Sequence, residues 1–470
     1  MSVTEEIARF AAEIQYDNLP PFVVSETKKL LLDSIGCTIG GIKTQKGEIA
    51  IKLALVLGGQ AENGLWGTSY KVGAAQSAYA IGELMNALDY ESLLSPPAHA
   101  TPYVLAAPLA IAEMKKVSGK ELIVATAIAH ELATRIASAM IFGRRFSVEL
   151  AERGIAMSLP TPGYGVCAFG GAAAAGRLLG LDALRIAHAM GIAGYNAPVP
   201  MVGKFVTTVP VSDAKYMSSG FLSLAQTVAV ISADMGSTGD IEVLDGDQGF
   251  WRAFGCDKWM PEYITSGLGN KWVFTDRLFY KRYPCCGVMQ NALCHLEEII
   301  TTNDILPDDI MRITVKLNSL ADLPLWKTRD VKTHIQAQFS VPFVFSLAAN
   351  RIETSPFWQI KETIEDRRIH EFMKKISLIT DLDDKSGIRP EVEVTAIKEA
   401  NKKTYFKSGI SKKYEMTDDD ITDKFRRNTR LLLDEKQVEK VIKDFKNLED
   451  IGDVSDIFKY FTKTGQGDKL

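Results

Sequence analysis

Apolar residues recur at helical spacing along most of the first 270 positions. Residues 1–12 contain the first such segment, in which Ile7, Phe10 and Ala11 fall on one face of a helix. This segment lacks the basic stretch followed by an apolar block that marks a signal peptide. It therefore predicts a first helix that belongs to the folded protein.

The same periodicity predicts a further series of helices in this half of the chain. One helix is expected to begin at Ser25, whose side chain can cap free backbone N–H groups, and to end at Gly36, with Gly40 and Gly41 breaking the chain again. The Ala/Gly-rich run 169–179 is expected in the interior, because small side chains let helix axes approach closely. The other predicted helices cover 73–88, 103–116, 121–139, 170–179 and 218–234.

The pattern changes beyond position 275. Residues 311–317 and 392–397 alternate between apolar and polar side chains, which predicts half-buried strands separated by helical stretches such as 340–349. The segment 418–461 returns to helical spacing, and we expect it to pack against the N-terminal helices. A chain of 470 residues exceeds what one core usually organises, so two or more domains are expected.

Charge and apolar content narrow the range of partners. The formal net charge is -4, and no dense basic cluster with interleaved aromatics occurs, so no nucleic-acid partner is expected. The Lys-rich stretch 402–413 is interrupted by apolar residues and is expected to be a solvated face or loop. The most apolar windows, 103–112 and 223–233, are too short or interrupted to span a bilayer, so no membrane segment is expected.

The six cysteines form no CxxC pair and no regular disulfide spacing, which is typical of a reducing compartment and predicts a cytoplasmic protein. The neighbours Cys285 and Cys286 cannot alone hold a metal or an iron–sulfur cluster, which needs three or four ligands. A hydratase mechanism that depends on such a cluster is therefore disfavoured. Nor does the chain carry a GxSxG elbow, an HExxH motif or the GK[ST] of a phosphate loop.

Histidine is scarce, with six in the chain, so each one is a candidate acid or base near neutral pH. His99 is the strongest candidate, since it follows a helix end in a Ser/Pro-rich loop where an imidazole stays accessible. Asp89, ten residues earlier, is placed to orient and charge-stabilise it. Taken alone, this pair is a weak signal that fits an ordinary loop histidine and a surface aspartate better than a functional pair.

The remaining histidines are weaker candidates. His130 and His188 fall within apolar helical segments and are expected in the interior. His295 and His370 have charged neighbours on amphipathic helices and are expected at the surface. His334 lies in a polar stretch and is left open.

Two groups of cations suit a carboxylate ligand. Lys281 and Arg282 precede a rigid turn, Tyr283-Pro284-Cys285-Cys286. Lys215 stands near the start of an Ala/Leu-rich helix, where the helix dipole favours anions. By themselves, these residues also fit ordinary exposed basic side chains.

Eight segments in this order resemble the MmgE/PrpD family, which includes 2-methylcitrate dehydratase, cis-aconitate decarboxylase and iminodisuccinate epimerase. The resemblance covers nearly the whole chain. Its segments are DSIGCTIGG (33–41), NALDYES (86–92) with His99, HELATR (130–135), FGGAAAAGRLLGL (169–181), SDAKYMSSG (212–220), YKRYPCC (280–286), AQFSVPF (337–343) and YEMTDDDITDKF (414–425).

The resemblance implies a mainly α fold in two domains. A large all-α domain is built from both chain ends, 1–273 and 413–470, and a smaller α+β lid from 274–412. It also implies a homodimer, no metal or organic cofactor, and an active site between the helical domain and the lid.

The resemblance further implies roles for individual residues. Asp89 and His99 match the family's Asp and His at the same spacing, while Lys215 and Lys281 match its two lysines; all four are expected to be catalytic. The other four candidate site residues, expected to contact substrate, are Arg282, Thr161, Cys286 and Tyr283.

Three positions depart from the pattern of dehydratase and decarboxylase members. Thr161 and Cys286 stand where those members carry histidines, and Leu93 stands where they carry a threonine. The leading expectation is a hydro-lyase that dehydrates a hydroxylated di- or tricarboxylate. An isomerase or epimerase, a decarboxylase, and a non-catalytic carboxylate-binding protein remain alternatives.

Overall fold

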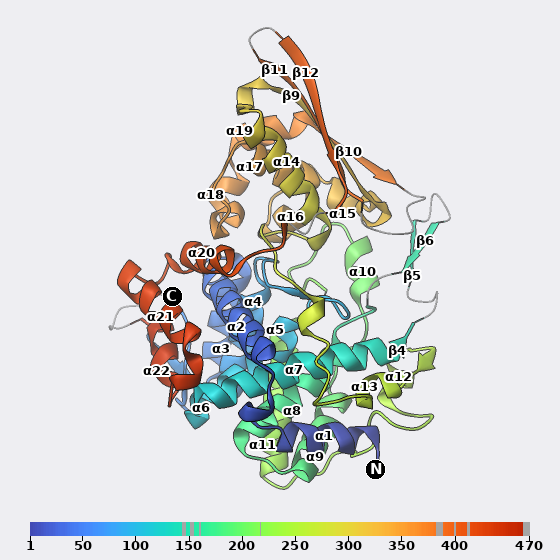
Figure 1. The fold of residues 1–470 in the computed structure, drawn as a ribbon, viewed down its shortest axis with the longest axis vertical. Coiled ribbons are helices and arrows are strands. Elements are labelled where there is room, and N and C mark those ends of the chain that lie inside the picture. Colours follow the sequence, from blue (N-terminus) through green and yellow to red (C-terminus); the bar gives the residue numbers. More distant parts are fainter. Residues whose placement is uncertain are drawn as a thin grey trace.

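The computed structural model describes residues 1–142, 147–150, 155–158, 161–216, 218–381, 389–398, 401–410 and 414–463. It shows a mainly α, two-domain fold (Figure 1). Helices from both ends of the chain form the larger region. A four-stranded sheet with its own helices forms the smaller region at one end of the molecule.

The helices of the first 270 residues pack around α7 and α8, which lie at the centre of the larger region. Most of the predicted helices are confirmed, with ends shifted by a few residues. Their bounds are α1 Val3–Glu13, α2 Pro21–Gly41, α3 Gln45–Leu57, α4 Ala74–Asn86, α5 Thr101–Val104, α6 Ala106–Lys115, α7 Gly119–Ala139, α8 Ala168–Leu179, α9 Ala183–Tyr195, α10 Val202–Thr207, α11 Ser219–Asp234, α12 Phe250–Ala253 and α13 Glu262–Thr265.

Small side chains permit the close packing of α8 on α7. A Cβ added to Gly170 would lie 2.5 Å from the carbonyl oxygen of Ala129, so only glycine fits this contact. The expected interior position of this Ala/Gly-rich helix is confirmed. Among the described helices, α7 alone is long and apolar enough to cross a membrane, yet 94% of its most apolar window is buried inside the protein. Core packing therefore accounts for its composition.

The predicted bounds of α2 are wrong at both ends. The helix begins at Pro21, whose fixed φ and missing N–H suit the first helical position, and it continues through Gly36 to Gly41. Gly36 lies inside the helix and does not end it, whereas the helix does end at Gly41, where a second break was expected. Neighbouring elements approach both glycines closely. A Cβ on Gly41 would lie 2.2 Å from the carbonyl oxygen of Leu84, and one on Gly36 would lie 3.0 Å from the Phe425 ring.

The sheet of the smaller region has the strand order β10-β9-β11-β12, with β9 parallel to β10 and antiparallel to β11. The two predicted strands are confirmed as β9 and β11, and the predicted helix over 340–349 as α17. The elements are α14 Gln290–Thr302, β9 Ile310–Asn318, α15 Pro324–Lys327, α16 His334–Phe339, α17 Val341–Ala349, α18 Lys361–Ile364, α19 Arg367–Phe372, β10 Ile376–Asp381, β11 Glu391–Lys398 and β12 Asn401–Ser408.

The Lys-rich stretch forms the edge strand β12, where most side chains from 401 to 410 are exposed, as expected for a solvated face. Residues 411–413 of that stretch lie outside the described residues. The expected boundary at 412/413 falls there too, and the domain boundaries stay predictions.

Short two-stranded ribbons connect the loops of the larger region. The pair formed by β3 Leu93–Leu94 and β8 Leu278–Phe279 joins the loop that carries His99 to the segment that precedes Lys281. The other pairs are β1 Asn63–Gly64 with β2 Lys71–Val72, β4 Met140–Ile141 with β7 Lys258–Trp259, and β5 Ser147–Leu150 with β6 Ile155–Ser158.

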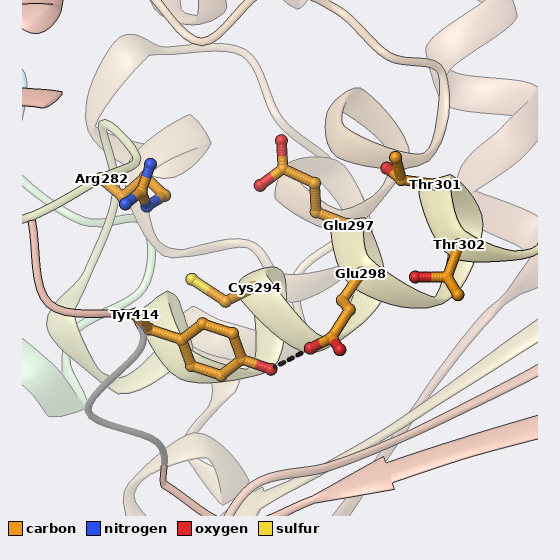
Figure 2. A pocket seen from close by; sticks show the side chains of 7 residues that line it. All are labelled: Arg282, Cys294, Glu297, Glu298, Thr301, Thr302 and Tyr414. Carbon is orange, nitrogen blue, oxygen red and sulfur yellow. Dashed lines mark hydrogen bonds between the residues drawn. The ribbon is translucent and has the colours of Figure 1, made fainter.

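The expected surface position of His295 is wrong. His295 is only 3% exposed on α14 and binds the Tyr414 hydroxyl through Nδ1 at 2.9 Å and the Gly409 carbonyl through Nε2 at 2.8 Å. Tyr414 also donates to Glu298 on the same helix (Figure 2). The C-terminal segment covers this side of α14, a contact that the local pattern of charges could not reveal.

The C-terminal helices return to the N-terminal ones, as expected: α20 Asp418–Thr429 packs along α2, followed by α21 Glu435–Lys446 and α22 Ser455–Phe458. A buried ion pair fixes this return, since Lys424 Nζ lies 2.7 Å from Asp33 Oδ1 and neither side chain is more than 1% exposed. The same ammonium donates to the carbonyls of Tyr90 at 2.7 Å and Lys281 at 3.0 Å. Lys424 thus ties together two chain segments that carry candidate site residues.

Replacing Lys424 by Met should lower the free energy of unfolding by about 3–5 kcal/mol, because the Asp33 carboxylate would stay buried without a partner. Urea denaturation measures this change. Lys28→Met is the matched control, since Lys28 also joins α2 to the C-terminal segment through Glu449 at 2.9 Å, but at the partly exposed surface. Its loss should be about 1 kcal/mol or less. Equal losses in both variants would contradict a special role of the buried pair.

Candidate active site

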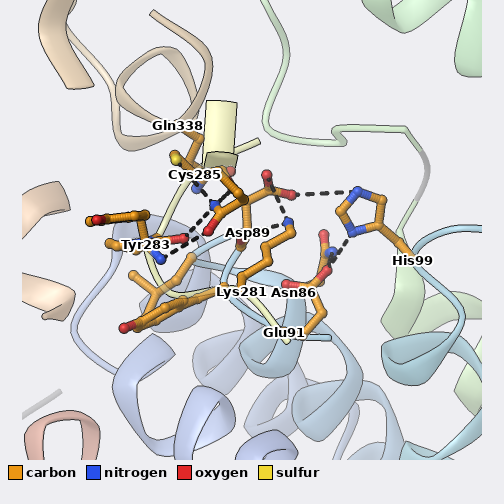
Figure 3. A network of polar contacts seen from close by, with 12 residues as sticks. Asn86, Asp89, Glu91, His99, Lys281, Tyr283, Cys285 and Gln338 are labelled. Carbon is orange, nitrogen blue, oxygen red and sulfur yellow. Dashed lines mark hydrogen bonds and ion pairs between the residues drawn. The ribbon is translucent and has the colours of Figure 1, made fainter. Parts of the chain in front are cut away.

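A buried carboxylate, Asp89, lies at the centre of the candidate site just after α4 (Figure 3). Its Oδ1 lies 2.9 Å from Lys215 Nζ, and its Oδ2 lies 3.2 Å from Lys281 Nζ. Lys281 also donates to the Asp89 backbone carbonyl at 2.7 Å. The structure therefore brings together three of the four residues expected to be catalytic, with Lys215 and Lys281 lying 126 and 192 positions after Asp89 in the chain.

Two of these residues adopt a backbone conformation that L-residues rarely take. Asp89 has φ 53° and Lys215 has φ 54°, both in the left-handed region. Lys215 also donates to the Asn86 carbonyl at 3.1 Å, which fixes the turn around Asp89. Such conformations cost of order 1–3 kcal/mol each and cluster at functional sites.

His99, the fourth expected residue, joins the cluster through a different carboxylate from the one expected. Its Nδ1 lies 2.7 Å from Glu91 Oε1, while its Nε2 lies 3.8 Å from Asp89 Oδ1 (Figure 3). Asn86 Nδ2 donates to the same Glu91 oxygen at 2.7 Å. Glu91 therefore has the orienting role that was expected for Asp89. Asp89 instead faces Nε2, the other ring nitrogen of His99.

Two tyrosines complete the surroundings of the imidazole. The Tyr216 ring stacks on His99 with centroids 4.6 Å apart, and its hydroxyl donates to Asp89 Oδ1 at 2.5 Å. Tyr164 approaches His99 edge-on with centroids 6.0 Å apart. Sequence analysis missed both tyrosines and Glu91. A usable signal existed for Glu91, a second carboxylate in the same segment as Asp89, and for Tyr216, the neighbour of Lys215.

The charges of the site keep both carboxyl groups ionised. Burial alone would raise the pKa of Asp89, but Lys215, Lys281 and His99 outweigh it and hold the pKa well below its usual range. Burial likewise opposes ionisation of Glu91, yet Lys281 and the hydrogen bond from His99 lower its pKa to about 2. An ionised Glu91 can only accept, so the Nδ1 of His99 carries the proton of this hydrogen bond.

The pKa values of the three basic groups of the site shift in different directions. Burial and the nearby Lys281 lower the pKa of His99, against the effects of Asp89 and Glu91. Burial lowers the pKa of Lys215 despite its contact with Asp89, whereas Asp89 and Glu91 outweigh burial and raise the pKa of Lys281. At neutral pH the free site therefore favours a neutral imidazole beside two ammonium groups.

Thr161 and Cys286, which stand where the resemblance places histidines, are both buried, and Cys286 lies within electrostatic reach of Asp89. The Thr161 hydroxyl donates to the Gly163 carbonyl at 2.6 Å. Cys286 is 8% exposed, and burial together with Asp89 raises its pKa to about 11. Neither group exchanges a proton readily at neutral pH.

Arg282 and Tyr283 turn away from the cluster. The Arg282 guanidinium pairs with Asp420 at 3.2 Å and lines a surface hollow beside α14 (Figure 2). The Tyr283 hydroxyl donates to Glu297, another residue lining the hollow, at 2.5 Å. The structure thus does not bring these two side chains together with Asp89 and His99, and their expected contact with substrate stays a prediction.

Asp89, Glu91 and His99 offer potential metal-ligand atoms within 4.8 Å of one another. However, both Asp89 oxygens already contact ammonium groups, and Lys281 also stabilises Glu91. A divalent cation would meet strong repulsion there. The arrangement is better suited to binding an anion and transferring a proton.

Fold and site together define a mainly α, two-domain protein with an enclosed acid–base centre. Residues 5–261 match the MmgE/PrpD N-terminal domain and residues 283–449 match the MmgE/PrpD C-terminal domain. The chain therefore belongs to the MmgE/PrpD family, which confirms the resemblance seen in its sequence.

Curated relatives of the chain are cis-aconitate decarboxylases. The enzyme of Homo sapiens is 24% identical over 97% of this chain and 93% of its own length. The enzyme of Mus musculus is 22% identical over 97% and 92%. That of Aspergillus terreus is 24% identical over 80% and 78%. These relatives are lyases, which supports a lyase-type activity for the family without specifying a dehydration.

Glu91→Gln should lower kcat by about 10²-fold or more, because an amide in place of the carboxylate no longer holds the imidazole in one tautomer with a charge beside it. Steady-state kinetics with an accepted substrate measures the loss. Glu121→Gln, a change in a partly exposed carboxylate that pairs with Arg177 on the helical body, is the control and should retain full activity. Full activity of Glu91→Gln would contradict the assignment of Glu91 as the orienting group.

Proposed function

We propose that this protein is a lyase that releases carbon dioxide from a small unsaturated polycarboxylate such as cis-aconitate, with its own side chains as the acid–base groups. The observation that supports this reaction is the supply of exchangeable protons. Of the described groups in the cluster, His99 alone combines an ordinary pKa near neutrality with contacts to both Asp89 and Glu91. One exchangeable proton matches a reaction that needs one proton delivered to carbon.

The proposed step balances as follows. The bond between the departing carboxylate and its carbon breaks, and its electron pair moves into the remaining unsaturated carboxylate. The enolate-like charge faces the ammonium groups of Lys215 and Lys281, which stabilise it where it develops. The imidazolium of His99 then donates its proton, and a new C–H bond forms while carbon dioxide leaves.

Dehydration requires more proton transfers from the same groups than decarboxylation does. It requires removal of a proton from carbon and delivery of a proton to the departing hydroxyl, which two acid–base groups usually share. Thr161 and Cys286 stand where members of both classes carry histidines, so these two positions do not separate the two reactions. The smaller proton demand of decarboxylation and the cis-aconitate decarboxylases among the relatives favour decarboxylation over the dehydration expected from sequence. Epimerisation and binding without turnover are outcomes that the assay below distinguishes.

Incubation of the purified protein with cis-aconitate in heavy water should release carbon dioxide and place one deuterium on the product, as measured by carbon and proton NMR. His99→Gln should lower this rate by about 10²–10⁴-fold, since it removes the proton donor. His188→Gln, a change far along the helical body where His188 bonds Gly239, is the control. Release of water from 2-methylcitrate, or deuterium uptake without loss of carbon, would overturn the proposal.

The pH dependence tests the direction of proton transfer. As a donor, His99 acts in its protonated form, and the protonated fraction falls tenfold per pH unit above its lowered pKa. We therefore expect kcat/KM for cis-aconitate to fall about tenfold per unit from pH 7 to 8.5. If neutral His99 were a base, as in dehydration, kcat/KM would be constant over that range, and this result would contradict decarboxylation.

A further inference from the structure

A second histidine near the cluster has no partner for either ring nitrogen. His334 begins α16 and is only 3% exposed, and neither Nδ1 nor Nε2 makes a hydrogen bond with a described residue. A buried polar atom without a partner destabilises the fold, because it loses its hydrogen bonds to water. A neutral imidazole offers one N–H donor and one acceptor nitrogen, so this ring indicates a place where a ligand accepts from the N–H.

Lys46, from α3, is the second group at this place. It is 4% exposed, and its ammonium lies 3.0 Å from Glu83 Oε2 in an ion pair whose geometry makes no hydrogen bond. The other oxygen of Glu83 accepts from the Gly220 N–H at 2.6 Å and from the Ser218 hydroxyl. Glu83 is therefore shared, and the Lys46 ammonium keeps its capacity to donate.

Contacts of α16 place His334 beside the active site. Gln338 on the same short helix donates to the Ala87 carbonyl at 2.6 Å, two residues before Asp89. The Phe339 ring lies 6.4 Å from the Tyr216 ring, which in turn stacks on His99. The helix that carries His334 thus packs directly on the loop and the ring that form the catalytic cluster.

His334, Lys46 and Lys215 also lie within electrostatic reach of one another. Burial, Lys46 and Lys215 lower the pKa of His334 to about 3, and Lys46 contributes to the lowered pKa of Lys215. Lys215 forms an ion pair with Asp89, and Lys46 forms one with Glu83. His334 pairs with no carboxylate among the described residues. The three groups therefore place three hydrogen-bond donors next to the reacting centre.

We propose that His334 and Lys46 form a subsite for a further carboxylate of the substrate, the one farthest from the reacting carbons. A carboxylate oxygen there would accept from the imidazole N–H and from the ammonium, and would supply the acceptor that the His334 N–H lacks. The subsite selects tricarboxylates over dicarboxylates. This inference rests on the proposed function, because it assigns the remaining carboxylate of the same substrate.

The test compares two non-reactive ligands by calorimetric titration, propane-1,2,3-tricarboxylate and succinate. His334→Phe keeps the ring shape and removes both nitrogens, and should weaken tricarboxylate binding about tenfold or more while leaving succinate within twofold. His188→Phe is the matched control at a remote, partly buried histidine and should change neither affinity. His334→Gln, which keeps one donor, should show a smaller loss confined to the tricarboxylate.

The outcomes separate this inference from the proposed function. Equal weakening of both ligands, or undiminished tricarboxylate binding in His334→Phe, would overturn the subsite even if the wild-type protein decarboxylates cis-aconitate. Should His334→Phe fail to fold, the His334→Gln titration decides, since unchanged affinity there also overturns the subsite. Absence of cis-aconitate turnover in the wild-type protein, with selective loss of tricarboxylate binding in the variants, would overturn the reaction and leave the subsite standing.

Discussion

The burial of one carboxylate between two ammonium groups governs the architecture of this site. Asp89 is inaccessible to solvent, as are the side chains of Lys215 and Lys281, so none of the three could stay ionised there without the others. Their three chain segments must therefore meet in one arrangement. Bringing these segments together requires the unfavourable left-handed backbone at Asp89 and Lys215, which the surrounding packing holds in place.

A second buried ion pair, between Lys424 and Asp33, fixes two of the chain segments that meet at Asp89. Lys424 is neutralised by Asp33 and uses its remaining hydrogens on the carbonyls of Tyr90 and Lys281, which flank the catalytic groups. The Tyr90 hydroxyl in turn donates to the Arg282 carbonyl at 2.9 Å. The C-terminal helix α20 thus contributes no group to the cluster but holds two of the three segments that do. This arrangement explains why the chain end returns to the helical region.

Much of this picture could be predicted from sequence because its signals are local. Helical spacing located most helices of the larger region, and alternation located β9 and β11. Ordered motifs identified the family, and with it Asp89, His99, Lys215 and Lys281. The details that escaped depend on long-range contacts. Glu91 rather than Asp89 hydrogen-bonds His99, and Gly36 permits close packing on Phe425 instead of ending its helix.

The charge balance of the buried groups suggests how the site acquires its proton. The three ammonium groups of Lys46, Lys215 and Lys281 are matched by the carboxylates of Glu83, Asp89 and Glu91. With a neutral imidazole the free site has no net charge, and burial keeps the pKa of His99 low. A polycarboxylate adds several negative charges next to that ring, and nearby negative charge raises the pKa of an imidazole. Substrate binding itself therefore favours the imidazolium that the proposed reaction consumes.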